Sequence, residues 1–534
     1  MKKQGFIKGA AILMIANGIS KILGAVFKIP MTYIVHEEGM AVFNTAFQIY
    51  IMILGFVICG FPLAISKSAA ESAERGDRAA AEKMLRAAER LLCGMGLLGS
   101  LIMYAGAFFF AAAAKEPNAA FAVRMLAPSV FLVAWGTAYK SYFQGLGNMI
   151  PTAVSQVTEA FIKLAAGFLL CAYLIRRSVA EAAGGVALGV SMGELFATLI
   201  LWGMYLREGH RTRLNRTEFY RETRLLMSIA LPILLISLIS NMLSLIDISV
   251  IRLRLEQCVF DGEESARFLR YYGRYTELFN RDGSAVITNA GAGWLYGAYS
   301  GFALTVFNLP LGILATLGVT IMPVIAGSMA AGDMGRAGRA ALKALRLSAF
   351  FSVPAAVLLF FFSSDILRLL FHNDASARLL SILAPGLVIT AMSSLGVTVL
   401  HSSGRIFPPF LIGFLGMLLK LGVQWVLAAD GGFHIEGIPI GFLCGELFCL
   451  IGIFWYLNQK IGLRLRYRDI LIRPVVGGAA MVGILLVLWE PVRNGLPETA
   501  ALGVMVCVSG LVYLLTELLI LPKSEKNIAI GRKM

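Results

Sequence analysis

Stretches of about 20 apolar residues, the length that a helix needs to cross the hydrocarbon core of a bilayer, recur throughout this sequence. We place about fourteen of them, at 6–34, 41–66, 91–114, 119–142, 151–175, 186–206, 225–254, 298–326, 346–363, 379–400, 407–429, 437–457, 471–489 and 499–521. Backbone N–H and C=O groups in hydrocarbon must be bonded within the protein, so segments of this length are predicted to be helices. Charged residues are only 15% of the chain, which also excludes a soluble protein. We therefore predict an all-α polytopic membrane protein.

The chain also contains two copies of one pattern. Gly147, Pro151, Lys163 and Leu164 recur 257 residues later as Gly404, Pro408, Lys420 and Leu421. The run 193–196 (GELF) recurs at 445–448, and the Gly-Asp pair at 76–77 recurs at 332–333. Similar offsets at several landmarks indicate an internal duplication, which is typical of secondary transporters.

The duplication predicts how the chain is divided. Each copy holds six spans, an even number, so both copies enter the membrane from the same side and the repeat is parallel. The basic stretch 207–224 joins them. We predict an N-terminal lobe at 1–224, a C-terminal lobe at 225–457, and a final part at 458–534 with two more helices and a cytoplasmic tail.

The net charge of +15 is distributed as a topology signal. Lys and Arg are about three times as numerous in the loops on one side as on the other, and the positive-inside rule then places both termini in the cytoplasm. We therefore predict a multi-pass protein of the cell membrane and no nucleic-acid partner. The seven Cys and five His have no metal-ligand or disulfide spacing, and no phosphate-binding loop is present, so we predict no metal or cofactor.

The first predicted span has a polar, cationic face. Asn17, Lys21, Gly24 and Lys28 follow one another at steps of four, three and four, which places them on one side of a helix. An isolated Lys in hydrocarbon is costly, so this face is expected to meet a wet cavity or an anionic ligand. The alternative for Lys28 is that its side chain reaches the outer interface.

The seventh predicted span carries a second polar stripe. Ser237, Ser240, Asn241, Ser244 and Asp247 recur at three or four residues, and Arg252 and Arg254 follow. We predict that Asp247 and Arg252 contact the substrate. Hydrogen bonding between helices is the alternative for the Ser and Asn side chains.

Other charges in predicted spans favour ion pairs. Glu159 precedes Lys163 by four residues, which suits a pair within one helix, and Glu194 is a second possible partner of Lys163. In the second copy Gly416 replaces the Glu, so Lys420 is predicted to pair with Glu446. Because unpaired buried charges are costly, we interpret these pairs as structural, with substrate contact as the alternative.

Several motifs resemble one known family. They are 20–24 (SKILG), 28–30 (KIP), 60–67 (GFPLAISK), 142–146 (YFQGL), 149–153 (MIPTA) and 155–157 (SQV). Together they resemble the SpoVB-type polysaccharide transporters, which share a superfamily (multidrug/oligosaccharidyl-lipid/polysaccharide, MOP) with the MurJ lipid II flippases and the MATE exporters. A basic pair that MurJ proteins carry in span two is absent here, where 53–57 is apolar.

This resemblance implies a two-lobed bundle with a cationic cavity that opens alternately to the two sides of the membrane. It implies a flippase for undecaprenyl-diphosphate-linked glycans, with Lys21 at the position of a functional first-span Arg in MurJ. The implied partners are the lipid-linked oligosaccharide, membrane lipids, and a coupling cation or the membrane potential. The alternatives are a cation-coupled multidrug exporter of the same fold and a membrane glycan polymerase or ligase; a transporter rather than an enzyme is expected.

Overall fold

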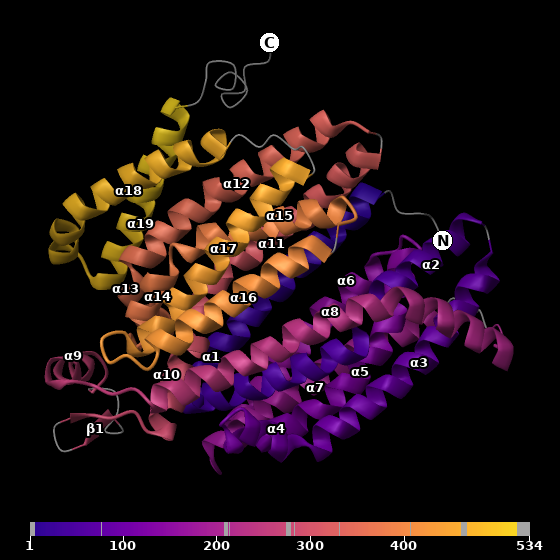
Figure 1. Ribbon diagram of the computed structural model, residues 1–534, viewed down its shortest axis with the longest axis horizontal. Helices are drawn as coiled ribbons and strands as arrows, with labels where there is room; N and C mark the ends of the chain where they lie inside the picture. Colours follow the sequence, from indigo (N-terminus) through magenta and orange to yellow (C-terminus); the bar gives the residue numbers. More distant parts are fainter. Residues whose placement is uncertain are drawn as a thin grey trace. The chain divides into compact units, whose positions relative to one another are not determined.

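The computed structural model describes residues 6–75, 77–207, 212, 214–273, 279–281, 284–330, 332–405, 407–460 and 467–520, nearly all of them helical (Figure 1). They form two compact units, Met1–Thr305 with Ala428–His434, and Val306–Leu427 with Ile435–Met534. The first unit extends beyond the predicted lobe boundary at 224/225 because helices after that boundary pack against the first helix of the chain. The lobe division follows the sequence repeat and stays a prediction.

The first unit is a helical bundle with a small external hairpin. Its elements are α1 (Phe6–Ile58), α2 (Phe61–Glu74), α3 (Arg78–Ala105), α4 (Ala107–Ala113), the 3₁₀ turn η1 (Pro117–Ala119), α5 (Ala120–Gly145), α6 (Ile150–Leu174), α7 (Val179–Arg207), α8 (Arg216–Glu256), α9 (Gly262–Tyr272), β1 (Asn280–Arg281), β2 (Ser284–Ala285), α10 (Asn289–Ala298) and the π-helix η3 (Tyr299–Ala303). The two strands pair antiparallel. Buried apolar side chains of α1 to α8 form one continuous core.

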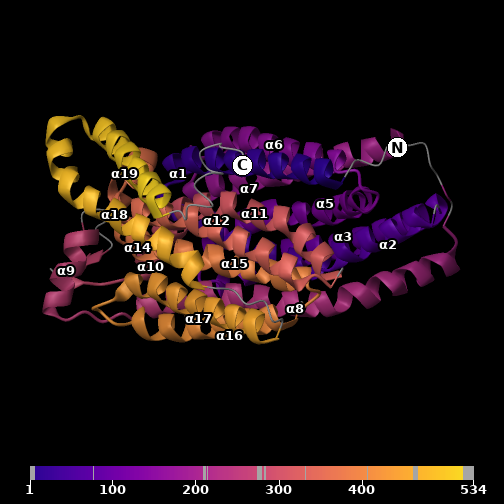
Figure 2. The same ribbon diagram turned by 90° about the horizontal axis from the view of Figure 1, so that it is seen from above.

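The second unit contains the remaining helices. They are α11 (Leu304–Ala330), α12 (Met334–Phe361), α13 (Ser363–Phe371), α14 (Ala377–Leu383), α15 (Gly386–Ser402), α16 (Phe407–Leu427), the 3₁₀ turn η4 (His434–Glu436), α17 (Gly437–Lys460), α18 (Tyr467–Gly495) and α19 (Glu498–Ile520). The pairs α16 with α17 and α18 with α19 lie side by side in both ribbon views (Figure 2).

The membrane-spanning character predicted from the sequence is confirmed. Every predicted span overlaps a helix. Within the described residues, 11 helices are long and apolar enough to cross a membrane, or 12 if the bent pair α14 and α15 counts as one span. The predicted first span lies in α1, and the predicted second span runs from α1 into α2. Between the two spans, His36 breaks the helical backbone of α1 with φ 52° and ψ −164°.

The duplication is visible in matching helix ends. Gly147 after α5 and Gly404 after α15 have φ of +76° and +74°, a conformation that favours glycine. At both ends the glycine N–H donates to the carbonyl three residues back, and the next N–H donates five residues back, which is the Schellman motif. Asp77 and Asp333 likewise cap α3 and α12 by accepting from the N–H three residues on, at 2.9 and 2.8 Å.

Glycines explain why the GELF run recurs. A Cβ added at Gly193 of α7 would lie 2.8 Å from the Glu159 carbonyl oxygen of α6. A Cβ at Gly445 of α17 would lie 2.7 Å from the Gly416 carbonyl oxygen of α16. Both helix pairs approach so closely because no side chain separates them, as in small-residue packing between membrane helices.

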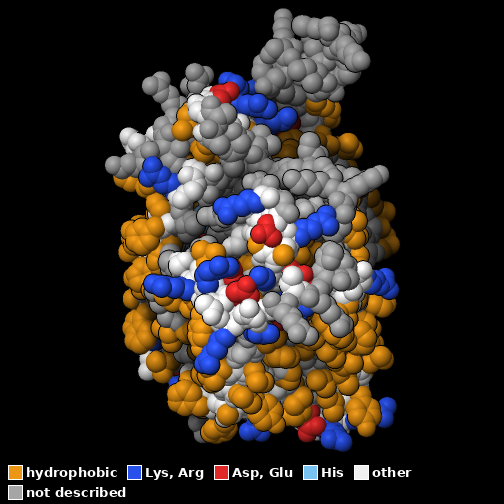
Figure 3. Space-filling model, turned by 90° about the vertical axis from the view of Figure 1, so that its right-hand side faces the viewer, with side chains coloured by type: hydrophobic (Ala, Val, Ile, Leu, Met, Phe, Trp, Pro, Cys, Tyr) orange, Lys and Arg blue, Asp and Glu red, His pale blue; other side chains and the backbone are white. Residues whose placement is uncertain are grey.

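Charged side chains are numerous on part of the surface. Figure 3 views the right-hand side of Figure 1, where Lys and Arg side chains gather with a few carboxylates among hydrophobic surroundings. In the first unit Lys83 of α3 donates to Glu218 of α8 at 2.6 Å, and the Asn215 N–H donates to the same carboxylate at 3.0 Å. The hydrogen bond from Lys83, which has the larger effect, and the one from Asn215 lower the pKa of Glu218 below its usual value.

Candidate functional site

The predicted cationic face of α1 is only partly described. Its backbone is helical throughout, and Asn17 is half-buried. The Ser20 hydroxyl donates to the Gln156 carbonyl oxygen at 3.2 Å, which holds this part of α1 against α6. The side chains of Lys21 and Lys28 lie outside the described residues, so their contact with substrate stays a prediction.

Arg252 of α8 lies in a buried polar site of the first unit. Its side chain is 1% exposed, and one guanidinium nitrogen lies 2.6 Å from a Glu116 carboxylate oxygen. The same nitrogen donates to the Lys115 carbonyl oxygen at 2.9 Å, and the Tyr296 ring centroid lies 5.4 Å from Arg252 Cζ. Glu116 therefore compensates the positive charge of Arg252, the residue that we predicted from the sequence to contact the substrate.

The Arg252 site still leaves hydrogen-bonding capacity. Arg252 Nε and its second terminal nitrogen have no hydrogen-bond partner among the described residues. Gly293 lies beside the ion pair, since a Cβ there would be in ordinary contact with both side chains, 3.5 Å from the Glu116 carboxylate and 3.8 Å from the guanidinium. The substrate contact predicted for Arg252 thus stays a prediction, beside a structural role that the ion pair already provides.

Asp247 lies one turn and a half before Arg252, near two tyrosines. Its carboxylate interacts electrostatically with the hydroxyls of Tyr296 and Tyr299. Tyr296 is hydrogen-bonded to Ser300, which in turn accepts from Asn44 of α1 at 2.9 Å. Tyr299 and Ser300 belong to the π-helix η3, a local irregularity that often occurs at functional sites. Of the polar stripe, the side chains of Ser237, Ser240 and Asn241 lie outside the described residues.

A polar cavity of about 200 Å³ adjoins the Arg252 site, large enough for several water molecules. Its polar lining comes from Glu38, Glu116, Asn118 and Asn289, and Trp294 also contributes. The sequence reasoning missed Glu38 and Glu116. Both residues lie in short connections between predicted spans. The one signal in the sequence that could have found Glu116 is its charge, which is opposite to that of Arg252.

A second charged cluster, which we call the α6–α7 cluster, contains Glu159, Lys163, Glu194, Lys140 and Tyr50. The Glu194 carboxyl interacts electrostatically with the Glu159 carboxyl and with Lys140 and Lys163. Lys163 Nζ lies 5.7 Å from the ring centroids of both Phe27 and Phe47. The structure thus brings the three predicted residues together, and their predicted role as structural ion pairs stays a prediction.

In the second unit, the counterpart of the α6–α7 cluster lies between α16 and α17. Glu446 of α17 accepts from the Ser393 hydroxyl of α15 at 3.1 Å. A Cβ at the preceding Gly445 would lie 3.0 Å from Lys420 Cβ, so α16 and α17 are in contact here. The ion pair predicted between Lys420 and Glu446 stays a prediction.

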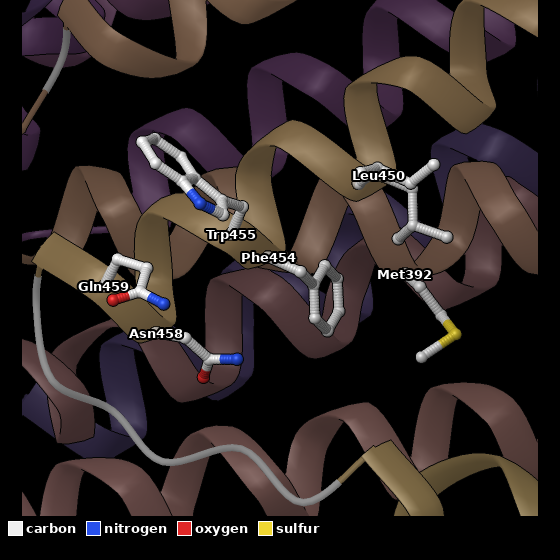
Figure 4. Close-up of a pocket in the computed structure, with 7 residues that line it drawn as sticks. Met392, Leu450, Phe454, Trp455, Asn458 and Gln459 are labelled. Atoms are coloured by element: carbon white, nitrogen blue, oxygen red, sulfur yellow. The ribbon is translucent and has the colours of Figure 1, made fainter.

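The second unit also holds an apolar groove of about 400 Å³, within the range of small-molecule sites. Figure 4 shows Trp455, Asn458 and Gln459 at one end of it, Phe454 in the middle, and Leu450 and Met392 at the other end. Its lining is hydrocarbon except at the amide end, which suits a lipid chain rather than a sugar or a diphosphate.

Two helical units with matching caps, charges inside the spans and a polar cavity define a multi-pass membrane transporter of duplicated architecture. The family model described as polysaccharide biosynthesis protein matches residues 6–329, and the model for lipid II flippase MurJ matches residues 290–505. The chain belongs to the polysaccharide biosynthesis protein family, since that match covers more than half of it.

Individual relatives agree with the family assignment. The chain is 25% identical to stage V sporulation protein B of Bacillus subtilis over 457 residues, covering 83% of this chain and 82% of the relative. It is 23% identical to lipid II flippase MurJ of the same organism over 485 residues, covering 84% and 82%.

Solved structures share the fold. Lipid II flippase MurJ in an inward closed conformation has a TM-score of 0.66 at 13% identity, covering 95% of this chain and 98% of that one. An inward-facing MATE family transporter of the MOP superfamily has a TM-score of 0.63 at 12% identity, covering 83% and 95%. The predicted fold class and family resemblance are confirmed.

Proposed function

We propose that this protein is a flippase that moves undecaprenyl-diphosphate-linked glycan, lipid II or a related cell-wall or polysaccharide precursor, across the cytoplasmic membrane by alternating access. The observation that carries the proposal is the joint coverage of the chain by the polysaccharide biosynthesis and MurJ family models, at 6–329 and 290–505. Full-length similarity to the MurJ structure supports the same assignment.

The chemistry of such a substrate fits the residues of α1. A diphosphate that leaves water needs fixed cations or hydrogen-bond donors to offset its desolvation. Lys21 and Lys28 on one face of the helix supply positive charge, and Asn17 supplies an amide donor on the same face. The apolar groove in the second unit suits a hydrocarbon chain of a lipid.

The protein acts in this proposal as a transporter without a catalytic step, in the cell membrane and with both termini in the cytoplasm. The second candidate is a cation-coupled multidrug exporter, which the MATE structural neighbours favour. Such an exporter would bind cationic drugs through carboxylates, whereas α1 presents two lysines on its polar face.

The test is flipping by purified protein in proteoliposomes that contain fluorescent lipid II. We expect wild type to move lipid II to the opposite leaflet, and Lys21→Ala to abolish flipping while the amount of folded protein is unchanged. Lys21→Arg should keep part of the rate because it keeps the charge, and Lys343→Ala, at an exposed position of α12, is the control for loss of one Lys.

Two results would contradict the proposal. Full flipping by Lys21→Ala would remove Lys21 from the substrate site. Export of cationic dyes by wild type, without movement of lipid II or of other diphosphate-linked glycans, would assign the chain to the drug-exporting class instead.

A further inference from the structure

Four connections of the first unit converge on the polar cavity of about 200 Å³. Its lining residues come from four separate stretches of the chain, within 38–42, 116–118, 179–180 and 289–294. The predicted topology places all four stretches on the same, outer side of the membrane, because each lies in or next to a connection that follows an odd-numbered span. All of them belong to the first unit, so the cavity is formed within one compact body.

The lining of this cavity offers hydrogen-bond acceptors and donors together. Glu38 and Glu116 contribute carboxylates, and Asn118 contributes an amide that can both donate and accept. Asn289 donates to Glu256, which leaves its amide oxygen as an acceptor. Glu38, Asn118 and Asn289 are exposed, so a ligand from outside can reach them, whereas Glu116 is buried.

A buried guanidinium beside the cavity is a second, independent indication of a ligand. Arg252 is 1% exposed, and its Nε and one terminal nitrogen have no hydrogen-bond partner among the described residues. That terminal nitrogen lies 4.0 Å from the position that a Cβ would take on Gly293, which lines the cavity. Buried polar groups in proteins are nearly always hydrogen-bonded, to the protein or to a bound molecule. Unused donors therefore lie next to the cavity wall at Gly293.

The charges around the cavity select the class of ligand. Glu38 and Glu116 would repel an anion, and a cation would lie in the field of the Arg252 guanidinium, which already compensates Glu116 at 2.6 Å. A purely apolar ligand would leave the carboxylates and amides without hydrogen bonds, which costs free energy. A neutral ligand rich in hydroxyl groups avoids all three penalties, because each hydroxyl can donate to a carboxylate and accept from an N–H group.

The apolar part of the lining suits one class of polyhydroxylated ligand. Ala41, Val42, Val179 and Ala290 contribute small hydrocarbon side chains, and Trp294 contributes an aromatic ring. A sugar ring carries hydroxyl groups around its edge and apolar C–H groups on its faces, so it needs both kinds of contact. The volume of about 200 Å³ is below the ~300–1,000 Å³ of sites for drug-sized ligands, so the cavity suits a single sugar ring.

We propose that this cavity is a saccharide site, in which a neutral sugar ring donates hydroxyl hydrogen bonds to Glu38 and Glu116 and accepts one from Asn118. At the outer side it holds a sugar of the lipid-linked glycan after transport. This second part rests on the proposed function and names where the glycan lies once it has crossed the membrane. Sugar binding itself does not depend on transport.

Sugar binding is tested first, without any transport. The purified protein, in a detergent that has no sugar headgroup, is titrated with N-acetylglucosamine, and saturation-transfer NMR gives the dissociation constant. Asn118→Ala should weaken binding about tenfold, the effect of one lost hydrogen bond. Ala290→Trp should abolish binding, because this exposed lining position then carries a side chain that fills the cavity. Asn494→Ala, at an exposed position of α18, is the control for loss of one amide and should bind as wild type does.

The charge argument gives a second readout of the same site. Glucuronic acid resembles glucose but carries a carboxylate, so wild type should bind it more weakly than glucose because Glu38 and Glu116 repel it. Glu38→Gln removes one of the two repelling charges and should reduce this difference. Glu263→Gln, which removes an exposed carboxylate of α9 outside the cavity lining, is the matched control and should leave the difference unchanged.

The link to transport is tested in proteoliposomes that contain fluorescent lipid II. N-acetylglucosamine, at a concentration that saturates the wild-type site, should slow flipping because it competes with the glycan of lipid II. The rate that Ala290→Trp retains should not respond to the sugar, and an equal concentration of betaine controls for osmotic effects. If Ala290→Trp does not fold, Asn118→Ala, at an exposed position, tests the same site, since about tenfold more sugar should then be needed to slow flipping.

Failure of this inference and failure of the proposed function give different results. If wild type binds neither N-acetylglucosamine nor glucose, or if Asn118→Ala and Ala290→Trp bind as wild type does, the saccharide site is overturned. If the sugar binds as expected but leaves flipping unchanged, the cavity takes a free saccharide and its place in transport is overturned. If wild type moves no lipid II while the binding results hold, the flippase assignment fails and the saccharide site remains.

Discussion

The Arg252–Glu116 pair allows a structural role and a substrate role to be separated by one substitution. Glu116→Gln removes the negative charge that lies 2.6 Å from a guanidinium with 1% exposure. Since the guanidinium is then left buried without its counter-charge, the change should destabilise the protein by about 3–5 kcal/mol, as for other buried pairs broken on one side. The Tyr296 ring and the Lys115 carbonyl contact Arg252 before and after the change, so they do not reduce this difference.

The assay is the free energy of unfolding of the detergent-solubilised protein, measured by titration with SDS. Arg252→Met combined with Glu116→Gln should recover most of the loss, because no uncompensated charge remains. Glu181→Gln is the control: its partner Arg177 lies 3.8 Å away and is 67% exposed, so the expected cost is about 0–1 kcal/mol. If Glu116→Gln is as stable as this control but stops flipping, the structural reasoning is refuted and Arg252 contacts the substrate.

Three further predictions concern topology, packing and pH. In a background without native Cys, a cysteine at 266, which is exposed on α9, should react with an impermeant thiol reagent in intact cells, and one at 215 should be protected; labelling at 215 would reverse the orientation. Gly193→Ala should destabilise the protein by about 1–3 kcal/mol, since the methyl group would lie 2.8 Å from the Glu159 carbonyl oxygen. Gly203→Ala, at a position with open space around it, is the control and should be neutral. Equal stability of the two variants would contradict the packing argument. Because the pKa of Glu218 is lowered in the folded state, this carboxylate should stabilise the fold above the ordinary carboxyl pKa, and the contribution should be lost as the pH falls through the lowered pKa. Glu218→Gln should therefore flatten the acidic part of a plot of unfolding free energy against pH. An unchanged plot would show that the hydrogen bond from Lys83 contributes nothing.

The sequence alone determined the membrane-spanning helices and the duplication. Helix is the form in which an apolar segment satisfies its own backbone in lipid, so length and hydropathy indicate which segments are membrane helices. The echoes at Gly147 and Gly404 also follow from local chemistry, because a positive φ after a helix favours glycine wherever it occurs. The family resemblance rested on such short motifs, and the comparisons confirmed it.

Only the tertiary structure decided which charges meet. Arg252 and Glu116 are 136 residues apart, and Glu159 and Glu194 stand on different helices, so no spacing along one helix could pair them. Helical periodicity gives the face on which a side chain lies, but the rotation and approach of neighbouring helices determine what it contacts. The close approach permitted by Gly193 is what brings the helices that carry Glu159 and Glu194 together.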